Sequence, residues 1–280
     1  QSIYAYAGSD ITLFTHFKQT MGYGLELKIT KTYRNAQEVI DIAGGFIQKN
    51  NSQLRKELIS PKHIDQPIII ESYSENVDRK KTAGKGGRYY MIGEKVEAIV
   101  EKIILENPKS SILLLGRYGF DAFHLSHSGK FVYNEKTGGV TSTKFPNVAL
   151  DFMTVHRAKG LGYDNVIIIN ARNEVYGFPS QVQDDPVLKY VVRDDHSIEY
   201  AEERRLFYVA LTRTKNRVYL IVPKERPSSF VLELIDDYLP VVLYGDIDKN
   251  ENKDNQEIKK CPICLRILER KSLPRRSSMN

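Results

Sequence analysis

Two kinds of apolar pattern alternate along the chain. Apolar runs and alternations of strand length predict β-strands over residues 25–30, 67–74, 111–119, 148–155, 165–170 and 218–222. Apolar residues at helical spacing predict helices over residues 11–20, 36–50, 93–108, 202–213 and 226–237. Strands that alternate with helices are typical of an α/β fold, in which a mostly parallel sheet is flanked by helices.

The stretch from residue 201 to residue 222 combines both patterns. Leu206 and Val209 lie on one face of the predicted helix, and Arg213 lies on the same face, four residues after Val209. Because a buried guanidinium without a partner is very costly, Arg213 must reach an anion or water. Residues 215–217 predict a turn before the next strand. The periodicity alone also fits an arginine in an ordinary surface salt bridge.

A second candidate site lies between the strand predicted at 25–30 and the helix that follows it. Tyr33 and Arg34 stand there, and Asn35 is predicted to cap the helix. Side chains between a strand and a helix N-terminus lie where α/β sheets bind ligands, beside backbone donors that suit anions. An exposed turn would give the same pattern.

Two further segments suit contact with a nucleic acid. Tyr4 and Tyr6 lie two residues apart in a polar segment, which fits base stacking as well as ordinary packing. Residues 78–90 interleave glycines with basic residues, which predicts a solvated loop that could touch a DNA backbone. This loop is not a P-loop, because GxxxxGK[ST] occurs nowhere in the chain.

Composition is that of an ordinary globular protein. Of the 280 residues, 41% are hydrophobic and 27% are charged. No apolar run reaches the roughly 18 residues of a transmembrane helix, and no signal peptide is present, so we expect a cytoplasmic protein. The chain begins with Gln1, and we therefore expect a fragment of a longer protein. A net charge of +6 and a pI near 9.0 are compatible with a polyanionic partner.

The C-terminal residues contain a possible metal half-site. Cys261 and Cys264 form a Cys-Pro-x-Cys sequence after a polar stretch that predicts a linker. This spacing is that of half a zinc site, but four ligands are needed and no Cys or His follows. The alternatives are a truncated zinc ribbon, two free thiols, or a site completed by another molecule.

Four segments in order resemble motifs III to VI of superfamily 1 helicases of the UvrD/Rep type. They are QSIY at 1–4, TYRN at 32–35, TVHRAKGLGYD at 154–164 and EERRLFYVALTRTKNRVYLI at 202–221. The resemblance extends over residues 1 to about 236 and is closest to the helicase IV subgroup. It implies a RecA-like P-loop NTPase fold and, in function, the C-terminal part of an ATP-dependent 3′→5′ DNA helicase.

The resemblance assigns a nucleotide site. Gln1, Arg34 and Arg213 match the residues that sense the γ-phosphate, and the two arginines would stabilise charge on the transferring phosphoryl group. Tyr33 matches the tyrosine that stacks on adenine. Gly160 belongs to the hinge between the ATP and DNA sites.

The resemblance also assigns contacts to single-stranded DNA. The residues so assigned are Tyr4, Tyr6, Thr154, His156 and Lys159. Four positions depart from the family pattern. Ala5 and Ala7 replace arginines, Thr32 replaces an asparagine, and Gly162 replaces a glutamate that touches the ribose, which puts discrimination at the sugar in doubt.

The same resemblance divides the chain into a helicase domain over residues 1–240 and a polar linker with the CPxC tail over residues 241–280. Residues 120–147 are too few for the large domain that many such helicases insert there. The P-loop lysine, the Mg²⁺-binding acid and the catalytic glutamate of the family lie in an N-terminal RecA-like domain. We expect ATP and Mg²⁺ between the two domains, single-stranded DNA as partner, no membrane, and Zn²⁺ as an option at the tail.

Two other functions fit part of the pattern. A helicase-like module that binds nucleic acid or protein without ATPase activity would keep the fold, but it need not keep Gln1, Arg34 and Arg213 together. A helicase joined to a nuclease is the other alternative, although no acidic nuclease cluster is visible in the sequence. An upstream P-loop would favour the enzyme over the module.

Overall fold

The computed structural model describes residues 17–22, 24, 27, 29–50, 57–76, 87–134, 136–182, 199–238 and 241–249. Its helices are α2 (Phe17–Met21), α3 (Gln37–Gln48), α4 (Gly87–Glu106), α5 (Phe120–Ser126), α6 (Ala201–Leu211) and α7 (Ser229–Asp237). Its strands are β1 (Ile68–Tyr73), β2 (Ile112–Gly116), β3 (Phe131–Asn134), β4 (Gly139–Ser142), β5 (Leu150–Thr154), β6 (Tyr163–Ile168), β7 (Thr214–Pro223) and β8 (Val241–Tyr244).

The strands form one sheet with the order β3-β4-β5-β2-β6-β7-β1-β8. From β5 to β8 every neighbouring pair is parallel. The hairpin of β3 and β4 is antiparallel and joins β5 at one edge. The predicted α/β fold with a mostly parallel sheet is therefore confirmed.

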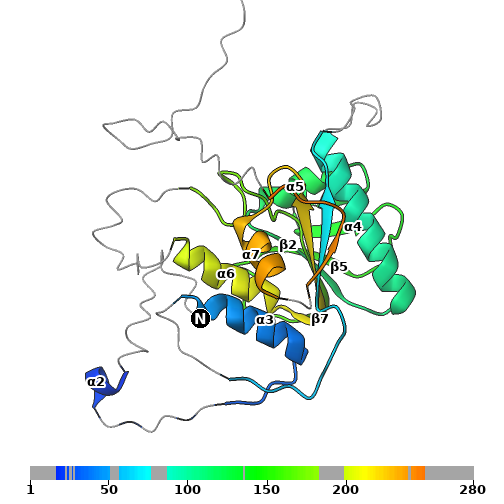
Figure 1. Ribbon diagram of the computed structural model, residues 1–280. Coiled ribbons are helices and arrows are strands. Elements are labelled where there is room, and N and C mark those ends of the chain that lie inside the picture. The colour runs from blue at the N-terminus through cyan, green and yellow to red at the C-terminus, as the bar shows by residue number, and fades with distance from the viewer. Residues whose placement is uncertain are drawn as a thin grey trace, which may run out of the picture.

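Helices cover both faces of the sheet (Figure 1). The helices α3, α6 and α7 lie on one face, and α4 and α5 lie on the other. Strand β7 shows how the sequence separates the two cores, because alternate side chains point to opposite faces. Val218, Leu220 and Val222 belong to the core under α3, α6 and α7, whereas Tyr219 and Ile221 belong to the core under α4.

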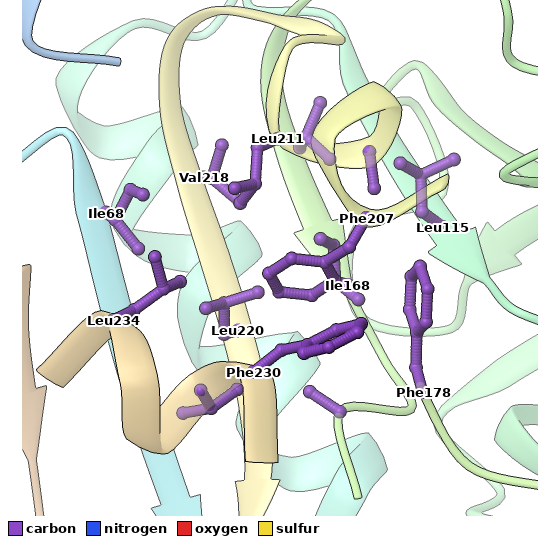
Figure 2. Packing of buried hydrophobic residues seen from close by; sticks show 14 of the residues in the cluster. Ile68, Leu115, Ile168, Phe178, Phe207, Leu211, Val218, Leu220, Phe230 and Leu234 are labelled. Atoms are coloured by element: carbon purple, nitrogen blue, oxygen red, sulfur yellow. The ribbon is translucent and has the colours of Figure 1, made fainter. Parts of the chain in front are cut away.

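Phenylalanine rings fill the core between the sheet and α3, α6 and α7, and Figure 2 shows three of them, Phe178, Phe207 and Phe230. Phe207 lies 5.0 Å from Phe178, 5.3 Å from Phe46 of α3 and 5.4 Å from Phe230, measured between ring centroids. Aromatic pairs of this kind contribute about 0.5–1.5 kcal/mol each beyond their burial. This packing fixes α6, which carries the candidate arginine just beyond its end, against the centre of the sheet.

Three predicted boundaries are wrong. Residues 215–217 are not a turn, because β7 begins at Thr214, where the Thr214 hydroxyl donates to the carbonyls of Asp164 at 3.0 Å and of Arg217 at 2.8 Å. The helix predicted over 93–108 begins at Gly87. Residues 241–244 were expected in a polar linker, but they pair with β1 as the edge strand β8.

Two other segments differ from prediction in structure content. The segment 120–147 was expected to be irregular apart from short alternating pieces, but it contains α5, β3 and β4. The strand predicted at 25–30 is not found in its described residues, 27, 29 and 30. Among the residues that the structure describes, no helix is both long enough and apolar enough to cross a membrane.

Candidate functional site

Three segments meet at the end of the sheet where the central strands β6 and β7 begin. Arg213 lies between α6 and β7, and its carbonyl accepts a hydrogen bond from the Tyr163 backbone N–H at 2.9 Å, which joins it to the start of β6. Arg34 comes from the turn before α3, and its Nη2 donates to the carbonyl of Gly160 at 3.5 Å. The two arginines assigned to ATP are thus brought to one place.

Local hydrogen bonds hold the Arg213 side chain, which is 8% exposed. Its Nε donates to the carbonyl of Val209 at 2.8 Å, its Nη1 to that of Leu161 at 3.1 Å, and its Nη2 to the Thr212 hydroxyl at 3.1 Å. The expectation that Arg213 must reach an anion or water is incomplete, because its guanidinium also finds nearby backbone carbonyls. These three acceptors are all neutral.

The two guanidinium groups affect each other. Burial lowers the pKa of Arg213 to about 10, and the positive charge of Arg34 acts in the same direction. Within the described ranges, neither arginine forms a salt bridge with a carboxylate. A pair of cations that is partly removed from water and lacks a counter-charge is suited to an anion.

Asn35 joins the segment of Arg34 to that of Arg213. Its side-chain Nδ2 donates to the carbonyls of Thr212 at 3.1 Å and of Thr214 at 2.5 Å, one on each side of Arg213. The prediction that Asn35 caps α3 is wrong: the cap position is Ala36, and no side chain caps the helix there. The amide instead donates to two backbone carbonyls of the α6–β7 segment.

The remaining predicted residues of the nucleotide site border the arginines. Tyr33 is 76% exposed, so its ring can stack on a ligand. Gly160 has a φ of +93°, a conformation that a side chain would strain. A Cβ on Gly162 would lie 3.4 Å from Cδ of Arg34, so Arg34 passes directly over this glycine.

The position of this site on the sheet differs from the prediction. Tyr33 and Arg34 were expected near the carboxyl ends of strands, where parallel sheets usually bind ligands. Arg34 instead lies beside Arg213 at the amino ends of β6 and β7. The reason is that Arg213 follows α6 and precedes β7, so the connection that carries it lies at the end of the sheet where β7 starts.

Thr154 and His156 lie at the opposite end of the sheet, where the strands β5 and β2 end. Thr154 ends β5 beside Gly116 of β2, and the next backbone N–H, of Val155, donates to the Gly116 carbonyl at 3.1 Å. Burial lowers the pKa of His156 to about 4, and the charge of Arg117 contributes. His156 is therefore neutral at physiological pH. The exposed Lys159 lies further along the same loop.

An ion pair at this second end of the sheet was not predicted from the sequence. Arg117 follows β2, and its Nη2 lies 2.6 Å from Oε1 of Glu203 in the first turn of α6. Glu203 also accepts from the Ser180 backbone N–H at 2.9 Å. The two glutamates before Arg204 were visible in the sequence, but nothing there connects them with an arginine 86 residues earlier.

Two elements run along the strand direction and connect the carboxyl ends of the strands with their amino ends. The loop 155–162 leads from the end of β5 to the start of β6, and α6 leads from Glu203 to the segment of Arg213. A strand of the six residues of β6 covers about 20 Å at roughly 3.3 Å per residue. The loop and α6 therefore connect the residues of the two predicted sites directly.

Some predicted site residues lie outside the described residues. They are Gln1, Tyr4, Tyr6, Cys261 and Cys264. Among the residues that are described, no group of three or more His, Cys, Asp or Glu side chains could hold a metal ion.

Comparison with known proteins shows what this chain is similar to. The sequence profile of the UvrD-like helicase C-terminal domain family matches residues 134–225, which include both the loop 155–162 and the segment of Arg213. The resemblance predicted from the motifs is confirmed: the chain is similar to the C-terminal domain of UvrD-like helicases.

Individual relatives agree. The chain is 31% identical to DNA helicase IV of Escherichia coli K12 over 86% of its own length and 31% of that protein. It is 27% identical to a probable DNA helicase II homolog of Rickettsia conorii, over 77% of the chain and 32% of the relative. The chain thus spans about a third of the length of these relatives.

A solved structure was also found, the C-terminal domain of a possible DNA helicase from Lactobacillus plantarum WCFS1. It is 14% identical, covers 76% of this chain and 98% of its own, and has a TM-score of 0.43.

Proposed function

We propose that this chain is the C-terminal RecA-like domain of an ATP-dependent DNA helicase that moves 3′→5′ along single-stranded DNA. The observation that carries the proposal is the pair of Arg34 and Arg213. Both guanidinium groups lie at one end of the sheet, and their partners within the described residues are neutral carbonyls and a hydroxyl. The similarity to DNA helicase IV and to a helicase II homolog supports the γ-phosphate of ATP as this anion.

The chemistry asked of the two arginines is electrostatic. Transfer of a γ-phosphoryl group spreads negative charge over its oxygens, and a positioned arginine is worth about 10³–10⁵ in rate. Arg213 is already held by three hydrogen bonds, so it need not be ordered when ATP arrives. The exposed Tyr33 is placed next to Arg34 in the chain and would stack on the adenine.

The other parts of the nucleotide site belong to a second domain in this proposal. The chain has no GxxxxGK[ST], so the P-loop lysine and the acids that hold Mg²⁺ would come from an N-terminal RecA-like domain of the same protein. Mg²⁺ held by those acids would neutralise charge on the phosphates. The described residues of this chain contribute no group of metal ligands.

Single-stranded DNA would bind at the opposite end of the sheet, beside the carboxyl end of β5. Thr154 and the neutral His156 would offer hydrogen bonds to the sugar–phosphate backbone, and Lys159 would add charge. The loop 155–162 then continues to Leu161, whose carbonyl accepts from Arg213. A shift of this loop on DNA binding would act on the arginine pair through that hydrogen bond.

Arg34→Ala tests the proposal most cleanly. Arg34 is exposed and makes one long hydrogen bond to Gly160, so its loss leaves the fold intact. In the protein that includes the P-loop domain, we expect kcat for ATP hydrolysis with saturating single-stranded DNA to fall at least about 10²-fold, the lower side of what such arginines supply. The affinity for ATP should fall less, because the contact strengthens in the transition state.

Lys31→Ala is the matched control, since Lys31 is an exposed cation in the same segment, and it should leave kcat unchanged. Arg213→Lys should restore only part of the activity lost in Arg213→Ala, because an ammonium cannot replace a planar fork. Normal kcat in Arg34→Ala and Arg213→Lys would contradict the helicase proposal. That result would favour a binding module without ATPase activity.

A further inference from the structure

Asn35 holds the segment of Arg34 at a fixed position relative to the segment of Arg213. Its amide group is 7% exposed and uses its two N–H groups on the carbonyls of Thr212 and Thr214. Arg34 precedes it in the chain, and Arg213 lies between its two acceptors. We propose that Asn35 is a positioning residue that sets the separation of the Arg34 and Arg213 guanidinium groups, and so the rate of ATP hydrolysis.

The geometry leaves few other side chains able to do this. Both acceptors are backbone carbonyls, so the clamp needs two N–H donors on a short side chain. Aspartate at this position would place acceptor oxygens against the two carbonyls. Serine or threonine would offer a single donor. Asparagine is therefore the shortest side chain that can bridge the residues on both sides of Arg213.

The other side of Asn35 is fixed as well. Its own carbonyl accepts from the Ser60 hydroxyl at 2.7 Å, and the Ser60 backbone N–H donates to Oε1 of Gln37 at 2.7 Å. The segment that carries Arg34 is thus held between Ser60 and the α6–β7 connection. Without the Asn35 amide, Arg34 would keep its long bond to Gly160. The other described links between the two segments, the packing of α3 against α6 and the hydrogen bond from Lys62 to Asn216, involve residues further along the chain from Arg34 than Asn35 is.

The inference rests on the proposed function, because it is the rate of ATP hydrolysis that should depend on the relative position of the two arginines. Displacing a catalytic group by about 1 Å can cost roughly 10²-fold in rate. For Asn35→Ala we expect kcat to fall about 10- to 100-fold, while KM for ATP changes less than about threefold. A residue needed only for folding would lower the amount of active protein instead, and it would leave kcat per folded molecule unchanged.

A double-mutant cycle separates the two roles. If Asn35 acts by placing Arg34 against Arg213, Asn35→Ala should lower kcat much less in the Arg34→Ala background than in the wild type, because residues that act together are not additive. An equal factor in both backgrounds would overturn the proposal. If Arg34→Ala has no effect by itself, the proposed function fails, and that outcome is distinct from a failure of the clamp.

Asn170→Ala is the matched control for loss of a buried amide. The Asn170 Nδ2 also donates to two acceptors, Oδ1 of Asp121 at 3.0 Å and the carbonyl of Tyr176 at 2.9 Å, but it follows β6 at the opposite end of the sheet. Asn170 is not among the residues assigned to DNA contact, so its loss should lower the melting temperature about as much as Asn35→Ala does and leave kcat at saturating single-stranded DNA unchanged. Equal losses of kcat in both variants would overturn the inference.

Ser60→Ala keeps the test decisive if Asn35→Ala does not fold. This change removes the bond from the Ser60 hydroxyl to the Asn35 carbonyl, together with the bond that the hydroxyl accepts from the Lys62 backbone N–H at 3.2 Å, and it leaves the Asn35 amide in place. We expect a several-fold loss of kcat that disappears in the Arg34→Ala background. Unchanged kcat in Ser60→Ala, with Asn35→Ala unfolded, would contradict a positioning role for this segment.

Discussion

At the scale of single residues, the arginine pair carries an electrostatic cost that an anion would remove. Arg213 is largely withdrawn from water, and the neighbouring charge is that of Arg34 rather than a carboxylate. The lowered pKa of Arg213 means that its charged form is less favourable in the folded chain than in the unfolded chain. A bound phosphate group would supply the missing counter-charge.

Pyrophosphate should therefore stabilise this chain against heat. At about a hundred times its Kd, a ligand that binds only the folded state adds about 2.7 kcal/mol, which corresponds to roughly 5–10 °C in melting temperature for a domain of this size. Arg34→Gln should reduce the shift. Scanning calorimetry at fixed ionic strength measures it.

The control for this measurement is Arg226→Gln. Arg226 is paired with Glu174 at 2.7 Å, so it already has a counter-charge and should not contribute to the shift. Equal shifts in the wild type, Arg34→Gln and Arg226→Gln would mean that pyrophosphate binds elsewhere.

Part of this residue-scale picture was predictable. The spacing from Leu206 and Val209 placed Arg213 on the apolar face of a helix; the residue is buried, but α6 ends at Leu211 and Arg213 follows it. Its partners were not predictable in full. Val209 lies four residues away, within one helical turn, but Leu161 lies 52 residues away, and no local pattern links it to an arginine.

At the scale of elements, a buried arginine ties three helices together. Arg204 of α6 donates to both carboxylate oxygens of Glu233 in α7, each at 2.7 Å, and to the carbonyl of Phe46 in α3 at 3.1 Å. Its guanidinium also lies 4.4 Å from the centroid of the Phe46 ring. The same helix ends at the segment of Arg213, so this contact fixes the element that carries the site.

Arg204→Ala should lower the free energy of unfolding by about 3 kcal/mol. Breaking a buried pair typically costs about 3–5 kcal/mol because a charge is left behind, and here Lys49 still lies 3.1 Å from Glu233, which favours the low end. Urea denaturation followed by circular dichroism measures the change.

Arg217→Ala is the comparison for this prediction. Arg217 pairs with Glu106, whose side chain is 48% exposed, and an exposed pair is worth about 1 kcal/mol or less. Losses of similar size in both variants would contradict the role given to Arg204.

Helix and strand patterns predicted the central elements better than their ends. The strands β1, β2, β5 and β6 follow apolar runs, which is why they were found. The start of β7 was missed because Lys215, Asn216 and Arg217 are polar and because the pairing with β6 is irregular there: Thr214 pairs with Tyr163 and Arg217 with Asn165, with a register shift between the two pairs. Asn35 was taken for a helix cap because capping asparagines look the same in a sequence.

At the scale of the whole molecule, the chain supplies one side of the proposed ATP site. It should not hydrolyse ATP by itself, because it has no P-loop to hold the β- and γ-phosphates. Phosphate release from the purified chain with ATP, Mg²⁺ and single-stranded DNA should equal that of Arg34→Ala. Turnover above this control would show a nucleotide site that the proposal does not contain.

The sequence predicted the class of fold, and it predicted that the chain is similar to the C-terminal part of these helicases, because four motifs occur in the expected order. It did not predict the order of the strands. Residues 241–244 were placed in a linker since the chain becomes polar soon afterwards, yet backbone pairing with β1 adds them to the sheet. Pairing between strands far apart in sequence leaves no local signal that could have shown this.

The hairpin of β3 and β4 has a consequence for how this domain can change in size. The hairpin lies at the outer edge of the sheet, and β4 pairs with β5 at one position, Gly139 with Asp151. Exposed hairpin tips tolerate insertions well, because few buried contacts depend on them. The turn at residues 136–138 is therefore a position at which the chain could acquire or lose a large module while the packing of α3, α6 and α7 stays the same. Architectures of very different size could be built on this one sheet by lengthening that turn.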